Sequence, residues 1–471
     1  MLSPTFCTDY NMTENIIKSK RDIPAVEIMA SDKVILEAAS GLARPLIVEI
    51  IRTTIDNFKQ NLDESFEPIS YDRFRDIIID NIRLMKLKKI GRVINGAGIM
   101  VHTNLGRAPL SDTLFDKIKN HVTGYGNLEF DVATGKRGKR GILAEKYLSL
   151  ISGAEAGTIV NNNAAALFLI LNTLANRRKV VISRGELVQI GGGFRIPDII
   201  RKSGAGIIEI GTSNITTIDD YKNALEANPA LILKVHKSNF AVTGFTEEID
   251  IKALVALGKK HNVPVVNDLG SGVLVDTTEI AGIKEPTVQN SVRDDADLTC
   301  FSGDKLLGGF QAGLIVGKKE LIDRIRKNPV YRAMRVDKTV FSAVEEMLGY
   351  YLDNTWKENI KLWRLATRSE SELYQKGRTL LDKIGAGDKI SLEGSQGEMG
   401  GGALPGVPLP SVALVFNSRV SPGKLAAMFR GTEPPVIGRI SENRFMIDLK
   451  AVDDEDAEIL VKIIISLSDR I

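Results

Sequence analysis

One stretch of the sequence indicates how the rest of the chain is built: Asp297-Leu-Thr-Cys-Phe-Ser-Gly-Asp-Lys-Leu-Leu-Gly-Gly-Phe-Gln-Ala-Gly-Leu-Ile-Val316. Its apolar runs, Leu298–Phe301 and Ala312–Val316, predict two buried strands. The turn between them, Ser302-Gly-Asp-Lys305, has little bulk and much backbone freedom. A lysine held in such a turn can lose its water, which lowers the pKa of its amine and makes it a nucleophile toward a carbonyl. These are the properties of a Schiff-base lysine, although a surface lysine in a hairpin turn is the simpler interpretation of these residues alone.

The composition is that of a globular protein with two or three domains: 471 residues, of which 43% are hydrophobic and 26% charged. A formal net charge of +3 gives no overall footprint for nucleic acid, so any such contact must be local. Two distant cysteines, Cys7 and Cys300, and four histidines without close pairing predict neither a disulfide framework nor a metal site. No signal-peptide pattern or membrane-length apolar run is present, so we expect a cytoplasmic protein without a membrane partner.

The N-terminal part of the chain has helical periodicity. Residues 1–20 are polar, and we expect them to be loosely ordered. Pro45 precedes an amphipathic segment from Leu46 to Phe58, and a second one runs from Tyr71 to Lys89. Residues 1–90 are therefore predicted to form a helical module.

From residue 91 onward, short apolar runs alternate with helical segments such as Ala164–Ala175 and Ile249–His261. The strand-like runs are Thr158–Val160, Lys179–Ile182, Gly206–Ile210, Leu231–Val235 and Pro264–Asn267. Strands separated by helices of this length predict a parallel sheet covered by helices, so we assign residues 91–340 to a large α/β domain. Residues 341–471 begin with long helices and continue with strand-like runs, which predicts a small C-terminal α/β domain.

Three asparagines, Asn161, Asn162 and Asn163, lie between the strand-like run that ends at Val160 and a helix of small residues. The N-terminus of a helix offers free amides and is a natural seat for a phosphate group. An ordinary asparagine N-cap is the simpler interpretation of this turn taken by itself.

Asp268 lies just beyond a buried strand, at the edge where open α/β sheets bind ligands. A carboxylate there can pair with a protonated ring nitrogen, which pyridoxal 5'-phosphate (PLP) needs in order to act as an electron sink. A helix cap or a loop carboxylate is the alternative. However, the order of a phosphate-type turn, this aspartate and a lysine 37 residues later matches the PLP enzymes with the aspartate aminotransferase-like fold (fold type I).

Longer motifs make a closer match. They are Ile94–Leu110, Tyr125–Asp131, Gly135–Gly138, Ser183–Asp198, Lys234–Phe240, Asp268–Gly272, Ser302–Lys305 and Gly400–Pro405. In this order they resemble the bacterial selenocysteine synthases, the L-seryl-tRNA(Sec) selenium transferases, and the resemblance runs from about residue 23 to the C-terminus. Gln189 stands where an acidic residue would be expected, away from the chemistry.

The resemblance implies a set of cofactor contacts. Lys305 forms the internal aldimine with PLP, Asp268 pairs with the pyridine nitrogen, and the turn Asn161-Asn162-Asn163 holds the phosphate. His236 lies near the ring, where it can stack on it. Asp304, next to the lysine, orients either that lysine or the substrate, and no metal is implied.

Three arginines, Arg107, Arg332 and Arg335, carry a further implication of the resemblance. Guanidinium groups bind phosphate-like groups in a bidentate manner, and Arg332 and Arg335 would share a face on a helix. The resemblance implies that the three bind the selenium donor, selenophosphate. Without it they would be interpreted as surface salt-bridge residues.

The implied activity is a β-replacement on L-seryl-tRNA(Sec). Loss of the serine hydroxyl gives a dehydroalanyl intermediate, and selenium from selenophosphate then gives L-selenocysteinyl-tRNA(Sec) for selenoprotein synthesis. The module at 1–90 is the natural candidate for tRNA contact by shape and phosphate recognition, with a structural or oligomer-forming role as the alternative. The resemblance also implies a ring-like homo-oligomer, a decamer.

Two other functions are compatible with parts of the sequence. One is a PLP-dependent lyase of the same superfamily that acts on a small amino acid or an amino sugar phosphate, although such chains are expected to lack the N-terminal module. The other is a scaffold that keeps the fold only to bind RNA. The presence of both Asp268 and Lys305 argues against this alternative.

Overall fold

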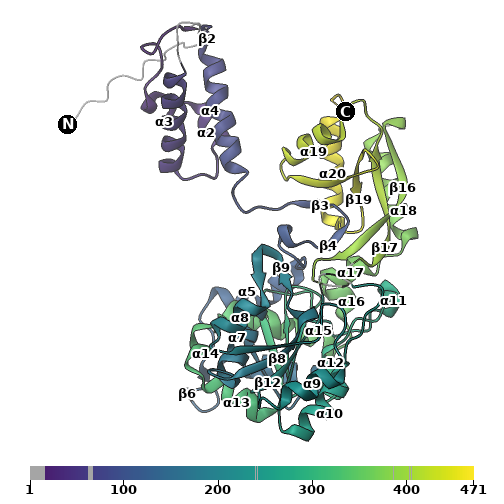
Figure 1. Ribbon diagram of the computed structural model, residues 1–471. Helices are drawn as coiled ribbons and strands as arrows, with labels where there is room; N and C mark the ends of the chain where they lie inside the picture. The colour runs from purple at the N-terminus through teal and green to yellow at the C-terminus, as the bar shows by residue number, and fades with distance from the viewer. Residues whose placement is uncertain are drawn as a thin grey trace, which may run out of the picture. The chain divides into compact units, whose positions relative to one another are not determined.

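The computed structural model describes residues 16–61, 67–238, 240, 242–385, 387–402, 404 and 406–470 (Figure 1). The chain divides into two compact units, Met1–Arg92 and Val93–Ile471, each of which has its own core. Most of the N-terminal stretch that we expected to be loosely ordered, residues 1–15, lies outside the described residues. None of the helices in the described ranges combines the length and the apolarity that crossing a bilayer requires.

The first unit is built on two helices, α3 (Arg44–Gln60) and α4 (Tyr71–Lys86). Pro45 lies in the first turn of α3, and the Ser70 hydroxyl caps α4 by accepting from the Arg73 N–H. Their apolar faces meet in a core that includes Ile51, Ile55, Phe74, Ile78 and Ile82. The smaller elements are β1 (Ile16–Ile17), α1 (Val26–Met29), α2 (Lys33–Ala38) and β2 (Ile69–Ser70). Both predicted helices are thus confirmed: the bounds of the first shift by two residues at each end, and the second ends three residues earlier than predicted.

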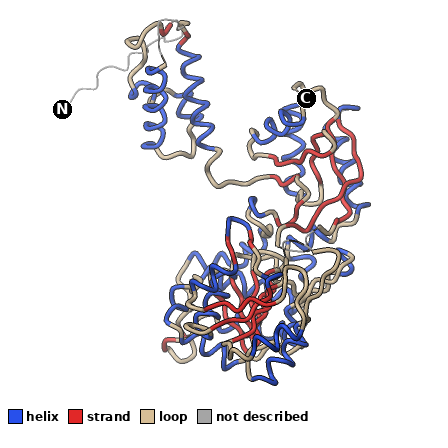
Figure 2. The backbone as a smooth tube through the Cα atoms, in the orientation of Figure 1, coloured by secondary structure: helices blue, strands red, loops and turns tan. Residues whose placement is uncertain are grey.

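A seven-stranded sheet forms the centre of the second unit, with the strand order β11-β8-β12-β13-β14-β15-β7. Figure 2 draws its strands in red, with helices around them. Its strands are β7 (Ala156–Val160), β8 (Lys179–Ser183), β11 (Gly206–Ile210), β12 (Leu231–Val235), β13 (Val265–Gly270), β14 (Leu298–Ser302) and β15 (Gly313–Gly317). The predicted parallel arrangement is confirmed except at β15, which is antiparallel to both neighbours. The short turn after β14 cannot make a parallel crossover, so the chain reverses there.

Helices cover both faces of this sheet because alternate residues of each strand point to opposite sides. Val180 and Ile182 of β8 pack toward α7 (Asn163–Leu174) and α8 (Ile196–Lys202), whereas Val181 packs toward the opposite layer. The further helices around the sheet are α5 (Asp112–Thr123), α6 (Ile142–Ser152), α9 (Ile218–Leu225), α10 (Ile251–His261), α12 (Val288–Arg293), α13 (Lys319–Lys327) and α15 (Lys338–Leu352).

A second sheet has six strands in the order β3-β18-β19-β17-β16-β4. They are β3 (Ile94–Gly96), β4 (Ile99–Val101), β16 (Ile390–Gly400), β17 (Pro408–Phe416), β18 (Val436–Ser441) and β19 (Arg444–Asp448). The core on one face is shared with α18 (Glu370–Ile384), α19 (Pro422–Arg430) and α20 (Asp454–Leu467). This sheet takes strands from both sides of the boundary expected near residue 340, because residues 94–101 pair with the C-terminal strands.

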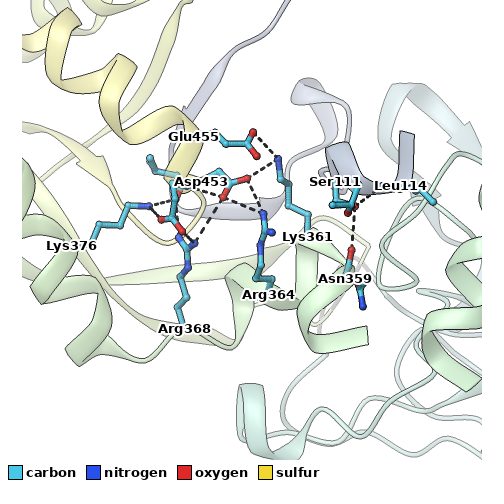
Figure 3. Close-up of polar contacts among 12 residues, drawn as sticks. Ser111, Leu114, Asn359, Lys361, Arg364, Arg368, Lys376, Asp453 and Glu455 are labelled. Atoms are coloured by element: carbon cyan, nitrogen blue, oxygen red, sulfur yellow. Dashed lines mark hydrogen bonds and ion pairs between the residues drawn. The ribbon is translucent and has the colours of Figure 1, made fainter. Parts of the chain in front are cut away.

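Ion pairs join helix α17 (Lys361–Ala366), which packs on the large sheet, to the start of α20, which packs on the second sheet (Figure 3). Helix α17 contributes Leu362 and Trp363 to the core of the large sheet, and its charged side chains reach the start of α20. There the buried Asp453 carboxylate receives Lys361 at 2.7 Å and Arg364 at 3.2 Å.

Candidate active site

The predicted lysine and aspartate lie together at the C-terminal edge of the large sheet, where ligands of such sheets bind. Asp268 belongs to β13, and Lys305 follows the adjacent strand β14. The Leu306 N–H donates to the Ser271 carbonyl oxygen at 3.0 Å, which joins the lysine turn to the end of β13. Two strands that are neighbours in the sheet therefore deliver the two groups.

Asp268 is a buried carboxylate held in a fixed position. Its Oδ1 accepts from Asn163 Nδ2 at 2.8 Å, and the Gly270 N–H and the Cys300 thiol are also hydrogen bonded to it. Burial raises the pKa of Asp268, although the Asn163 hydrogen bond and the charge of Lys305 act against this. A cationic ring nitrogen beside this carboxylate would complete its stabilisation.

Lys305 is 7% exposed, and burial lowers the pKa of its amine even though the Asp268 charge acts to raise it. The amine lies against glycine backbone. A Cβ added at Gly402 would fall 2.6 Å from Nζ, and one at Gly270 would fall 3.9 Å from it. Both glycines also have positive φ values, +79° and +64°, so larger residues are disfavoured twice. Space at the amine is therefore maintained by the backbone, and Gly402 is a site residue that the lysine motif alone did not reveal.

The three asparagines have separate roles. Asn162 caps α7 by accepting from the Ala165 N–H at 2.9 Å, and Asn163 holds Asp268. The Asn161 N–H donates to the Met334 carbonyl oxygen at 3.0 Å. Gly313 of β15 presses on this turn, because a Cβ there would collide with the Asn162 carbonyl. The turn thus lies at the N-terminus of α7 beside Asp268, as a phosphate seat requires.

Two buried polar atoms at this edge have no hydrogen-bond partner within the described part of the chain, Asn163 Oδ1 and Ser271 Oγ. Buried polar atoms normally find partners, so unpaired ones in a site are candidates to bind a polar group of a ligand. A lysine with lowered pKa, a buried carboxylate, a helix N-terminus and these atoms together fit PLP. Among the residues described, no group of three or more His, Cys, Asp or Glu side chains is placed to hold a metal ion.

His236 follows β12 directly and also reaches the site. Its N–H donates to the Asp268 carbonyl oxygen at 2.9 Å, and its Nε2 lies 3.0 Å from Oε1 of the buried Glu285. Glu285 is not among the residues predicted from the sequence. Nothing in the local pattern marks it, since it lies in a loop 49 residues from the histidine.

Arg107 and Asp304 form an ion pair beside the lysine, with Nη1 2.7 Å from Oδ2. The Ala108 N–H also donates to the Asp304 carbonyl oxygen at 3.2 Å. Arg107 has a φ of +69°, which belongs to the tight loop that carries it to the site. The structure therefore brings both predicted residues to Lys305.

Arg332 and Arg335 do not share a helical face, so that part of the prediction is wrong. Helix α14 (Pro329–Ala333) is capped by Asn328 and has only five residues, so it ends before Arg335. Arg332 is exposed. Arg335 lies over the Tyr331 ring, lines a pocket of about 290 Å³, and has a buried Nε without a hydrogen-bond partner among the described residues.

Comparison with known proteins identifies the family. A family model described as L-seryl-tRNA selenium transferase matches residues 93–453. The L-seryl-tRNA(Sec) selenium transferase of Alkaliphilus oremlandii is 39% identical over 93% of this chain and 97% of that protein. The protein of the same name from Aquifex aeolicus is 42% identical over 88% of this chain and 92% of that protein.

Among solved structures, D-glucosaminate-6-phosphate ammonia-lyase superposes with a TM-score of 0.58 at 19% identity, covering 82% of this chain and 98% of that one. This similarity concerns the fold, and it confirms the predicted α/β, aspartate aminotransferase-like architecture of the large domain. Since the family model and the relatives span most of the sequence, the chain belongs to the L-seryl-tRNA(Sec) selenium transferase family.

Proposed function

We propose that the edge of the large sheet around Lys305 is the catalytic centre of this enzyme. As a member of its family, the chain converts L-seryl-tRNA(Sec) to L-selenocysteinyl-tRNA(Sec) with PLP as cofactor. The observation that carries the assignment of the site is the buried Lys305, with its lowered pKa, beside the buried Asp268.

Four features of the chain would hold the cofactor. Lys305 would bind its aldehyde carbon, Asp268 its ring nitrogen, the N-terminus of α7 with Asn161, Asn162 and Asn163 its phosphate, and His236 one side of its ring. When bound there, PLP supplies an electron sink for the negative charge that develops on the serine Cα.

Lys305 is the group that moves the proton. Its amine is buried and its pKa is lowered, so it is available as a neutral base for the Cα proton of the serine. The neighbouring Asp304 carboxylate is paired with Arg107 at 2.7 Å. The same ion pair fixes the backbone next to the lysine and therefore the position of Nζ.

Selenophosphate is the proposed selenium donor, and arginines would bind it. The pocket at Arg335 is also lined by Arg137, Arg140 and Arg326, but Glu129 and Glu145 pair with these three. Arg335 is left with a buried Nε that has no hydrogen-bond partner within the described residues, which makes it the best candidate of the four to bind an anion. Its neighbour Met334 bonds to Asn161, which puts the pocket beside the phosphate seat. Arg107, and Arg332 at the surface, would complete the donor site.

The N-terminal module, residues 1–90, is proposed to contact the tRNA, with residues 91–340 as the catalytic domain and 341–471 as the small domain. The module folds as a separate unit. The end of α4 and the residues after it carry the cations Arg83, Lys86, Lys88 and Lys89, which suit phosphate recognition on an RNA helix.

A homo-oligomer, a ring-like decamer, is proposed for the assembled enzyme. Apolar side chains are exposed in one stretch of the second unit: Tyr125 is fully exposed, Val132 is 70% exposed and Ile142 is 60% exposed. Exposed apolar clusters of this kind typically mark interfaces between subunits. We place the reaction in the cytoplasm, where aminoacylated tRNA is made and used.

One assay tests the proposal. Purified protein loaded with PLP is incubated with seryl-tRNA(Sec) and selenophosphate, and the product is scored as selenocysteinyl-tRNA(Sec). We expect conversion with both substrates and none without the donor. Deamination of an amino sugar phosphate without any conversion of the tRNA would instead support a lyase of the same fold.

A further inference from the structure

We propose that Glu285 is a positioning residue of this active site, which fixes the orientation of the His236 ring and the nitrogen that carries its proton. The inference rests on the proposed function only in taking the edge around Lys305 as the catalytic centre. It concerns a contact between two of the chain's own side chains, each presented by a separate rigid segment.

Glu285 is presented by a loop that closes on itself. The buried Thr277 hydroxyl donates to the Ile283 carbonyl oxygen at 2.6 Å and accepts from the Glu285 N–H at 2.9 Å. Pro286 follows and restricts the backbone of Glu285 to extended conformations. The backbone of Glu285 is therefore held by its own loop.

His236 is presented by the sheet. Its backbone N–H bonds to the Asp268 carbonyl oxygen at 2.9 Å, so the Cα of the histidine is tied to the strand that carries the ring-pairing aspartate. The Ser238 N–H then closes a turn onto the His236 carbonyl oxygen at 2.9 Å. With its backbone held in this way, the ring can still rotate about its side-chain torsions, and the contact with Glu285 removes that freedom.

The direction of the contact follows from chemistry. An ionised carboxylate only accepts hydrogen bonds, so Nε2 must carry a proton and donate it to Glu285 Oε1 across the 3.0 Å. In a neutral ring this leaves Nδ1 as the free acceptor, and it prevents the flip that would exchange carbon and nitrogen atoms.

Glu285 depends on this contact in turn. Its side chain is 6% exposed, and His236 is the hydrogen-bond partner of its carboxylate within the described ranges. A buried carboxylate needs such a partner. Its charge also acts on Lys305, on which it tends to raise the pKa, so the carboxylate lies within electrostatic reach of the catalytic amine.

Full-length variants loaded with PLP test the inference. They are Glu285→Ala, Glu285→Gln, His236→Ala and the double variant His236→Ala/Glu285→Ala. Glu279→Ala, at an exposed glutamate of the short helix α11 (Thr278–Ala281) that precedes this loop, is the matched control. The readouts are the circular dichroism of the bound cofactor in its visible band, kcat and KM for seryl-tRNA(Sec), and the thermal midpoint.

We expect Glu285→Ala to weaken the visible dichroism and to lower kcat by roughly 10-fold, the lower end of the loss seen when the partner that orients an imidazole is removed. KM should change less than about twofold, and Glu285→Gln, which keeps an acceptor oxygen, should restore most of the loss. In the His236→Ala background, Glu285→Ala should have no further effect on kcat.

A Glu285→Ala loss that is equally large without His236 would overturn the inference, and so would unchanged dichroism and kcat in Glu285→Ala. A loss of thermal midpoint shared by Ala and Gln would indicate a structural role alone. Failure of the proposed function is distinguishable, because in that case the wild-type protein itself would give no conversion.

Discussion

The two sheets of the second unit differ in how completely a buried aspartate is paired. In the C-terminal sheet, Asp448 is fully buried and fully paired: it accepts from Ser411 at 2.6 Å, Ser395 at 2.9 Å and Arg439 at 3.1 Å. In the large sheet, Asp268 is also buried, but its nearest cation is an amine whose own pKa is lowered by burial. The pairing of Asp448 stabilises the fold, whereas the charge of Asp268 is left available to interact with a ligand.

Lys305→Ala gives the largest expected effect, because it removes the buried amine that lies beside Asp268. Activity should fall on the order of 10³-fold or more, and the visible absorption band of the lysine-bound cofactor should disappear. The thermal midpoint of the cofactor-free protein should stay within a few degrees of wild type, as should that of Lys319→Ala, an exposed control. Borohydride reduction followed by peptide mapping checks the attachment point, and cofactor found on another lysine would refute the assignment.

Asp268→Asn and Asp448→Asn test the comparison directly. Burial raises the pKa of Asp268, so in the cofactor-free protein its charge opposes folding at neutral pH, and asparagine should leave stability unchanged or higher while activity is lost. Asp448→Asn should instead lower the free energy of unfolding by about 3 kcal/mol, since it leaves Arg439 without its buried partner. Urea unfolding and the conversion assay measure both. Equal loss of stability in the two variants would remove the distinction between the sheets.

Deletion of residues 1–92 separates the two units. We expect the remaining chain to keep its cofactor band but to bind tRNA at least about 10-fold more weakly, as phosphate contacts are lost. Filter binding at fixed salt concentration measures the change. Undiminished affinity for tRNA in a folded truncated protein would rule out the role proposed for the module.

Arg335→Ala and Arg439→Ala extend the comparison to cations. Arg335 has an unpaired Nε within the described residues, whereas Arg439 is paired with Asp448 and Ser395. The first change should raise KM for selenophosphate by about 10-fold with little effect on KM for seryl-tRNA(Sec), as loss of a charge-assisted contact implies. The second should mainly reduce stability. Titration of each substrate at a saturating concentration of the other distinguishes the two variants. An unchanged KM for selenophosphate in Arg335→Ala would contradict the donor pocket.

Asp453→Asn gives the smallest expected effect. Although burial acts to raise it, hydrogen bonding from Lys361 and the backbone lowers the pKa of Asp453. Its ionised form therefore stabilises the fold above the unfolded pKa, and this contribution is lost as the pH falls through the folded value. The variant should be less stable by about 1 kcal/mol at pH 7, and the difference should shrink below about pH 4. A constant difference across that range would show that the charge is not the cause.

Much of the large domain could be predicted because its strands are buried on both faces and appear in the sequence as short apolar runs. The run that ends at Ile182 and the helix from Ala164 both lie where the pattern placed them. Lys305 could be found for the same reason, since it follows the end of β14, whereas Asp268 was expected just beyond its strand and instead lies within β13, which extends to Gly270.

Other features depend on contacts between distant parts of the chain. Residues 94–101 join the C-terminal sheet through backbone bonds that carry no side-chain signature. Glu285 meets His236 only because a loop folds back, and Arg335 leaves the helix because α14 is short. The division of the chain at residues 90 and 340, and the roles given to the site residues, stay predictions.

The reversed strand β15 has a mechanical consequence. It begins eight residues after Lys305, and its Gly313 rests on the carbonyl of Asn162. A single short hairpin therefore links the turn that carries Lys305 to the asparagine turn at the N-terminus of α7. A cofactor bound by Lys305 at its aldehyde and by the asparagine turn at its phosphate would be held at both ends by this one hairpin.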